Sequence, residues 1–231
     1  MQHTTKEIEN ENLFNLSNKK ISDNLVIFMK NKVYPWELLG KNLFSFLQQI
    51  IEDIPKEARI RGEVQEGAII KGDDVVICEG AVVEPTAYIE GPTWIGPNAT
   101  VRHGAYVRGK VFADADTVIG HATEVKGSIL MTGAKAAHFN YVGDSVLGVD
   151  TNLGAGTKLA NLKLKKNEVG ILVGREVVRT GLKKMGAILG DNAQTGCNVV
   201  TNPGTLLLPN TGLLSNTLGQ GIHKNEMAKL N

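Results

Sequence analysis

Aliphatic residues recur at every sixth position over most of the chain after residue 63. A period of six matches neither the 3.6-residue period of an α-helix nor the two-residue period of a strand. It is typical of a parallel β-helix built from hexapeptide units, each with one inward side chain. The pattern has a one-residue slip, and the predicted inward residues are Val64, Ile70, Val76 and Val82, then Ile89, Ile95, Val101, Val107, Ala113, Ile119 and Val125, and later Leu147, Leu153 and Leu159.

Three such units make one coil of the predicted β-helix. Positions eighteen residues apart in this sequence are therefore expected to stack on neighbouring coils, about 4.8 Å from each other. A narrow prism filled by small aliphatic side chains also explains why aromatic residues make up only 5% of the chain, whereas there are 26 glycines. The sequence predicts an all-β fold, with the β-helix over residues 57–231.

Residues 1–56 are predicted to form an N-terminal segment that precedes the repeat. Within it, residues 35–54 carry apolar side chains at helical spacing, and Pro35 suits the first turn of a helix. We expect one short amphipathic helix there. Because the terminal coils of a solenoid have unpaired edges, we expect this helix to cap the N-terminal end of the β-helix.

A basic stretch interrupts the repeat, and residues of about 162–187 are predicted to leave the β-helix as a loop. Long loops ejected from a regular fold often carry function. The stretch is either a solvated basic surface or part of a site for an anionic ligand. Its cations are Lys163, Lys165, Lys166, Arg175, Arg179, Lys183 and Lys184, and its acids are Glu168 and Glu176.

The net charge, the cysteine count and the N-terminal sequence limit the possible binding partners and the cellular compartment. A net charge of +1 indicates neither a nucleic acid nor a membrane as a partner. The two cysteines, Cys78 and Cys197, form no disulfide framework, which fits a reducing compartment. The polar N-terminus has no secretion signal, so we expect a cytoplasmic protein.

Arg108 and Lys126 lie eighteen residues apart, and each follows a predicted inward valine. They should therefore point the same way on adjacent coils, roughly 5 Å apart. Two like charges at that distance repel by about 1 kcal/mol even in water, whereas an anion between them would reverse the sign. The pair predicts a phosphate clamp, and solvated surface cations are the alternative.

His103, His121 and His138 should form a column, because each precedes a stacked valine by four residues. Zinc is one interpretation, as in β-helical carbonic anhydrases, but parallel side chains do not converge as tetrahedral ligands must. We therefore expect no metal, and surface histidines at His103 and His121. His138 has Asn140 and Tyr141 beside it and is a candidate proton acceptor, with a structural histidine as the alternative.

Two stretches carry a resemblance to a known family. KAAHFNYVGDSVLGVDTNLGAGT resembles the acetyltransferase domain of the bifunctional enzyme that makes UDP-N-acetylglucosamine, a left-handed β-helix of the hexapeptide acyltransferase superfamily. GTKLANLKL and RTGLKKMGAILGDNAQTGCNV are similar to archaeal sugar-1-phosphate nucleotidylyltransferases with the same acetyltransferase tail. The resemblance covers roughly residues 85–215. It implies an acetyl-CoA-dependent N-acetyltransferase for an amino-sugar phosphate such as glucosamine 1-phosphate, in nucleotide-sugar synthesis, and a homotrimer with sites between neighbouring prisms.

The resemblance also implies a role for each matching residue. His138 matches the general base that deprotonates the attacking amine, and Arg108 and Lys126 match the cations that hold the sugar phosphate. Cys197 falls where the family lines the coenzyme A arm, although a small buried hydrophobe is the alternative there. The substrate-orienting side chains match Tyr141, Asn152 and Asn161, and the backbone beside the thioester matches Gly154 and Ala155.

Three departures from the family keep other functions open. The glycine-rich pyrophosphorylase signature is absent, so no uridylyl transfer is expected. Asn167 stands near the place of a helpful lysine, and the basic tail is reduced to Lys224 and Lys229. A catalytically inactive β-helix that serves as a scaffold or binding subunit is therefore the second hypothesis, and a zinc hydratase is the third.

Overall fold

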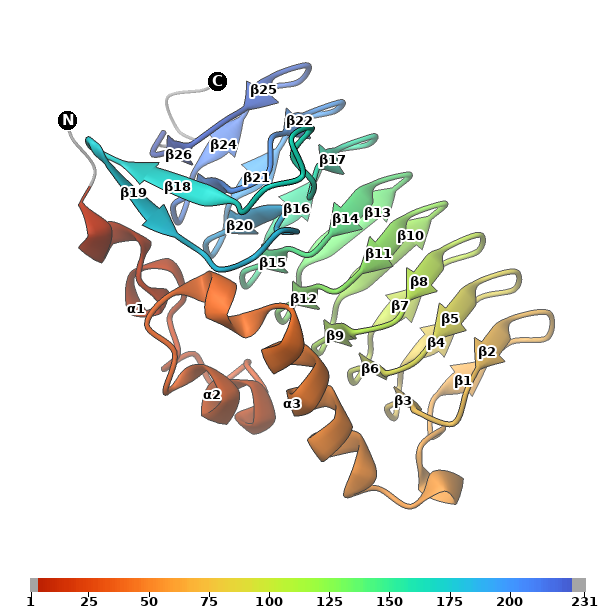
Figure 1. Cartoon of the computed structure of the whole chain (residues 1–231). Helices are drawn as coiled ribbons and strands as arrows, with labels where there is room; N and C mark the ends of the chain where they lie inside the picture. Colours follow the sequence, from red (N-terminus) through yellow and green to blue (C-terminus); the bar gives the residue numbers. More distant parts are fainter. Residues whose placement is uncertain (1–3, 226–231) are drawn as a thin grey trace.

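The computed structural model describes residues 4–225, and within them three parallel sheets wind into one β-solenoid (Figure 1). Each sheet holds eight described strands, one from each coil of the solenoid. We name the sheets after their first strands: the β1 sheet, the β2 sheet and the β3 sheet. The predicted fold class, a parallel β-helix built from hexapeptide units, is confirmed.

The strands are short, as expected for the flat faces of a narrow prism. The β1 sheet contains β1 Glu63–Val64, β4 Val82–Val83, β7 Thr100–Val101, β10 Val118–His121, β13 Lys135–His138, β16 Asn152–Leu153, β21 Gln194–Thr195 and β24 Gly212–Leu213. The β2 sheet contains β2 Ile69–Lys71, β5 Tyr88–Glu90, β8 Tyr106–Arg108, β11 Glu124–Lys126, β14 Tyr141–Gly143, β17 Lys158–Leu159, β22 Val200–Thr201 and β25 Leu218–Gly219. The β3 sheet contains β3 Val75–Ile77, β6 Thr93–Ile95, β9 Val111–Ala113, β12 Ile129–Leu130, β15 Val146–Leu147, β20 Ala187–Leu189, β23 Thr205–Leu207 and β26 Ile222–His223.

The inward aliphatic column of the repeat forms the core of the prism. In the β2 sheet, Ile89, Val107, Val125, Val142 and Leu159 are fully buried and pair in register from coil to coil. The step is eighteen residues from Val107 to Val125 and seventeen from Val125 to Val142. Because one inward residue per face suffices, the coil tolerates this change in length at a turn.

The slip in the repeat lies earlier than the sequence pattern suggested. Ile77 and Val83 belong to the inner core, whereas Val76 faces outward and Val82 is partly exposed. The prediction of Val76 and Val82 as inward residues is therefore wrong. The physical reason is that β3 and β4 carry adjacent aliphatic residues, so that both registers place an apolar side chain inside.

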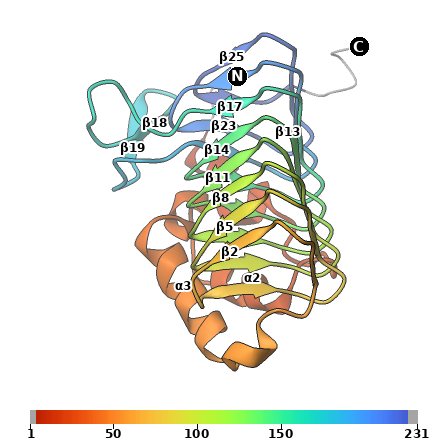
Figure 2. The same ribbon diagram turned by 90° about the vertical axis from the view of Figure 1, so that its right-hand side faces the viewer.

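The N-terminal segment packs against the outer face of the β3 sheet (Figures 1 and 2). Its helices are η1 Thr5–Ile8, α1 Asn10–Leu13, α2 Asp23–Met29, η2 Pro35–Leu38, α3 Lys41–Glu52 and η3 Lys56–Ala58. The predicted helix at residues 35–54 thus exists as η2 and α3, but it lies along this face instead of across the end of the first coil. None of the helices within residues 4–225 has the length and apolar character needed to cross a bilayer.

An apolar stripe on the outside of the β3 sheet explains this position. Because neighbouring residues in a strand point to opposite faces, a strand with two adjacent apolar residues places one of them on the outer face, where covering it is favourable. Phe46 of α3 meets the stripe, with its ring centroid 5.4 Å from that of Phe112, which in turn stacks on Trp94. The outward residues of the stripe are Val76, Phe112, Ile129, Val146, Ile188 and Leu206.

Two buried aspartates attach the segment between α1 and α2 to the solenoid. Asp191 accepts a hydrogen bond of 2.8 Å from the N–H of Asn15, and Asp114 accepts one of 3.0 Å from the N–H of Ser22. Burial raises the pKa of Asp191 above that of an exposed carboxyl. The two contacts fix the N-terminal segment to turns on well-separated coils.

We predict that Phe112→Ala destabilises the fold by about 3–5 kcal/mol, because it leaves a cavity where the helical segment meets the sheet. The free energy of unfolding from urea titration measures this loss. Ile27→Ala serves as the control, since the Ile27 side chain is 64% exposed and its truncation should cost less than about 0.5 kcal/mol. Equal losses in both variants would contradict the packing of the segment against this face.

Candidate functional site

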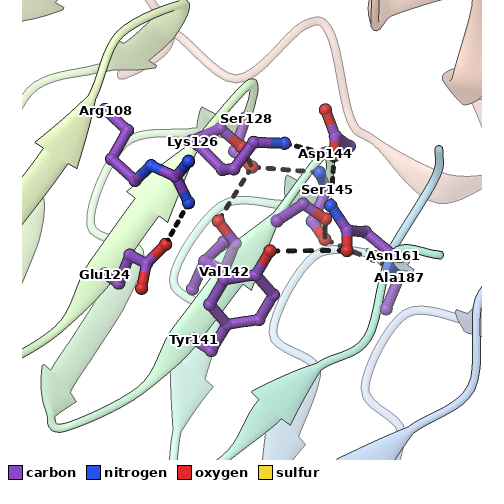
Figure 3. A network of polar contacts seen from close by, with 11 residues as sticks. Arg108, Glu124, Lys126, Ser128, Tyr141, Val142, Asp144, Ser145, Asn161 and Ala187 are labelled. Atoms are coloured by element: carbon purple, nitrogen blue, oxygen red, sulfur yellow. Dashed lines mark hydrogen bonds and ion pairs between the residues drawn. The ribbon is translucent and has the colours of Figure 1, made fainter.

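The outer face of the β2 sheet carries two cations on neighbouring coils. Val107 pairs with Val125 in register, which confirms that Arg108 and Lys126 follow stacked positions. Each cation has a carboxylate partner (Figure 3): Arg108 Nη1 lies 2.6 Å from Glu124 Oε1, and Lys126 Nζ lies 2.7 Å from Asp144 Oδ2. The repulsion that suggested a bound anion is therefore offset by the chain's own carboxylates.

Glu124 and Asp144 are members of this site that the sequence analysis missed. Glu124 lies two residues before Lys126 and so projects from the same face of β11. Asp144 directly follows Gly143, the residue that pairs in register with Lys126, and lies just after the end of β14. Strand alternation could have found Glu124, whereas Asp144 lies one residue out of the stacked register and could not be found by spacing.

Asp144 also organises two of the expected substrate-orienting residues. It accepts hydrogen bonds from both Lys126 Nζ and Asn161 Nδ2. Tyr141 Oη donates to Asn161 Oδ1 at 3.4 Å. Burial, together with the charges of Glu124 and Asp144, raises the pKa of Tyr141, so its hydroxyl remains a donor. One carboxylate thus links a cation, an amide and a phenol on a single face.

His138 lies at the corner between the β1 and β2 sheets, at the end of β13, with an exposed side chain. Its backbone is fixed by Asn140 Oδ1, which accepts from the His138 N–H at 3.1 Å. His121 pairs with His138 in register on the preceding coil, and its ring stacks on that of His103 with centroids 4.2 Å apart. Within residues 4–225, no group of three or more His, Cys, Asp or Glu residues is arranged to hold a metal ion.

His138, Ala155 and Cys197 occupy equivalent corner positions on three successive coils. The residue after each position donates its N–H one coil back: Gly156 to His138 at 3.0 Å, and Asn198 to Ala155 at 2.8 Å. Parallel strands place such positions about 4.8 Å apart. Cys197 is exposed, so its alternative interpretation as a buried hydrophobe is wrong.

The backbone expected beside the thioester offers one hydrogen-bond donor. The N–H of Gly154 already donates to the carbonyl of Thr195 at 2.9 Å. The N–H of Ala155 makes no hydrogen bond within the part of the chain that the structure describes. Ala155 is therefore the donor left available at this corner.

The expected site residues fall into two groups on one chain. Arg108, Lys126, Tyr141 and Asn161 lie on the outer face of the β2 sheet, and His138, Ala155 and Cys197 lie on the adjoining corner. Asn152 belongs to β16 and Gly154 follows it, both on the β1 sheet. The structure brings the two groups to adjacent surfaces of the prism but not into direct contact.

The basic stretch leaves the solenoid after β17 and forms the antiparallel hairpin β18 Gly170–Val173 and β19 Glu176–Arg179, which projects on the side of the helices (Figure 2). A cavity of about 600 Å³ lies between the stretch and the last coils, lined in part by Lys163, Leu164 and Lys165. Arg179 pairs with Glu168 at 2.8 Å, and Lys224 of the tail pairs with Glu7 at 2.9 Å. Lys229 lies outside the described residues.

Comparisons with known proteins place this fold and site in context. A model of the family described as the GMPPB C-terminal domain matches residues 89–222. The chain is 34% identical over 174 residues to the bifunctional sugar-1-phosphate nucleotidylyltransferase/acetyltransferase of Sulfurisphaera tokodaii, covering 74% of this chain and 41% of that protein. It is 38% identical over 188 residues to the bifunctional protein GlmU of Methanocaldococcus jannaschii, covering 74% and 40%. The chain spans about two fifths of the length of these relatives.

We predict that Asp144→Asn lowers the free energy of unfolding by about 1–3 kcal/mol, because Lys126 and Asn161 lose a shared charged acceptor. Asparagine tolerates the left-handed backbone of this position, where φ is 47°, so the change isolates the charge. Glu124→Gln is the matched control: its ion pair with Arg108 is 35–41% exposed, against 16–19% for Asp144 with Lys126, and should contribute no more than about 1 kcal/mol. Urea titration of both variants measures the difference, and a larger loss in Glu124→Gln would contradict it.

Proposed function

The chain belongs to the family of the GMPPB C-terminal domain, and on that premise we propose that it is an acetyl-CoA-dependent N-acetyltransferase. The acceptor in this proposal is an amino-sugar phosphate of nucleotide-sugar synthesis, such as glucosamine 1-phosphate. The observation that carries the proposal is the linked set of Lys126, Asp144, Asn161 and Tyr141 on the face next to the His138 corner.

In the proposed reaction, the amine of the sugar attacks the thioester carbonyl of acetyl-CoA. The imidazole of His138 accepts the proton that the amine loses as the C–N bond forms. The N–H of Ala155 donates to the oxyanion of the tetrahedral intermediate. Collapse breaks the C–S bond, and the thiolate of coenzyme A takes the proton from His138 to leave as the free thiol.

The sugar phosphate is proposed to bind at Arg108 and Lys126. A phosphate dianion there competes with Glu124 and Asp144 for the same cations. The exposed pair of Arg108 and Glu124 opens at low cost, because surface ion pairs contribute about 0–1 kcal/mol. Lys126 keeps its bond to Asp144, so Arg108 is the more adjustable side of the clamp. Tyr141 and Asn161 then orient the sugar hydroxyls, and Asn152 contributes from the neighbouring sheet.

A homotrimer completes the proposed site. On one chain the two groups lie on open, adjoining surfaces, and a second prism beside the corner would close a cleft over them. The apolar residues exposed on the β2 sheet, Ile69, Tyr106, Val200 and Leu218, support such a contact, as does Leu164 on the basic stretch. The basic stretch and Cys197 are then proposed to line the coenzyme A arm and its phosphates.

One observation favours the second hypothesis, a β-helix that serves as a scaffold or binding subunit. Both cations of the clamp are already neutralised by the chain's own carboxylates, which is the arrangement of a self-contained surface. The enzyme and the scaffold differ in one measurable property, thiol release from acetyl-CoA in the presence of an amino-sugar phosphate.

We predict that the wild type releases thiol from acetyl-CoA with glucosamine 1-phosphate or galactosamine 1-phosphate, and that His138→Ala lowers kcat by about 10²–10⁴-fold. The matched control is His121→Ala, because His121 pairs with His138 in register one coil earlier and is also exposed. That control should keep kcat within about threefold of the wild type, since the proposal gives His121 no proton to carry. Absence of turnover with a panel of amino-sugar phosphates would favour the scaffold, and equal losses in both variants would remove His138 as the base.

A further inference from the structure

Phe139, directly after His138, has a backbone conformation that bulky residues rarely adopt. Its φ is 39°, in the left-handed region. The equivalent corner positions of other coils hold Gly67, Gly104, Gly156, Ala122, Asn198 and Asn216, and also Thr86, whose φ is 66°. A large aromatic side chain at this place therefore costs conformational energy that glycine or asparagine would avoid.

The surrounding structure imposes this conformation through Asn140, which is buried. The Asn140 side chain donates from Nδ2 to the carbonyl of Gly154 at 2.8 Å and accepts from the N–H of His138 at 3.1 Å. The Asn140 N–H donates to Thr123 Oγ1 at 3.2 Å. The backbone on both sides of Phe139 is thus held, and strained residues held in this way cluster at ligand-binding sites.

The ring of Phe139 is not needed for the core, because the residue is 53% exposed. It lies over Gly156 on the next coil: a Cβ added to Gly156 would come within 3.0 Å of a ring carbon. Gly156 follows Ala155, whose N–H is the available donor of this corner. The ring therefore presents an apolar face beside Gly156, the residue that follows Ala155.

We propose that Phe139 is a substrate-contacting residue whose ring forms the apolar wall against the acyl group of the donor thioester. The inference rests on the proposed function and extends it to the choice of acyl group. A phenyl face at this place excludes water from the carbonyl that Ala155 would polarise, and hydrogen bonds to an oxyanion strengthen when water is excluded. The wall also limits the room for acyl chains longer than acetyl.

The decisive variant is Phe139→Asn, because asparagine stands at the equivalent positions 198 and 216 with φ of 56° and 62°. We expect the melting temperature to be unchanged or raised, while kcat/KM for acetyl-CoA falls about tenfold or more. The preference for acetyl-CoA over propionyl-CoA should also weaken. Phe139→Leu, which keeps an apolar side chain, should retain activity within about threefold. Ala122→Asn is the control at the same corner of an earlier coil and should change neither property.

Each remaining outcome separates this inference from the proposed function. Wild-type turnover that Phe139→Asn leaves unchanged would overturn the inference alone. If Phe139→Asn lowers the oligomeric mass together with activity, the ring contacts a second copy of the chain and the inference is wrong. If the wild type shows no turnover, titration calorimetry compares the affinities for acetyl-CoA and for coenzyme A. A higher affinity for acetyl-CoA that Phe139→Asn abolishes would support the contact of the Phe139 ring with the acyl group in a protein without catalytic activity. No binding of either compound by the wild type would overturn both.

Discussion

The stacking of one aliphatic side chain per face inside the prism is the interaction on which the rest of the molecule depends. Residues such as Val107, Val125 and Val142 have no solvent contact and lie above one another because the sheets are parallel and in register. This column fixes which residues face outward on the same sheet and at what spacing. Arg108 and Lys126 are neighbours, and His138 and Ala155 are neighbours, only because the column beneath them is continuous.

The sequence predicts the solenoid and the pairs on adjacent coils, since both follow from spacing alone. The helix expected at residues 35–54 was predicted at the end of the solenoid instead of along the β3 sheet. The reason is that the outward apolar residues, such as Phe112 and Ile129, cannot be distinguished from inward strand residues until the register is known. The same ambiguity misplaced Val76 and Val82 in the inner core. The carboxylate partners of the cations were missed for another reason: Glu124 is sixteen residues from Arg108, and Asp144 lies one residue out of register with Lys126. Spacing predicts neighbours well, but contacts between side chains depend on charges that no period reveals.

The polar face of the β2 sheet is arranged so that its charges balance before any ligand arrives. Lys126 shares Asp144 with Asn161, and Arg108 has Glu124, so the face has neither a bare positive patch nor an unpaired buried carboxylate. The corner differs, since it holds an exposed imidazole, a backbone donor without a partner and a strained aromatic residue within two coils. Balanced charge on one surface and unsatisfied groups on the next are what a two-substrate site would need, with binding on the first and bond making at the second.

The N-terminal segment contacts widely separated parts of the array: Phe46 packs on Phe112 of β9, Asn15 donates to Asp191 after β20, and Glu7 pairs with Lys224 after β26. Repeat arrays without such a tie lose cooperativity because each repeat contacts only its neighbours. Here the N-terminal segment packs against several coils at once. Unfolding of one coil therefore also exposes apolar surface of this segment, which other coils help to bury. Because the N-terminal segment is synthesised before the coils that it covers, its contacts with Asp191 and Lys224 can form only after those late residues have been made.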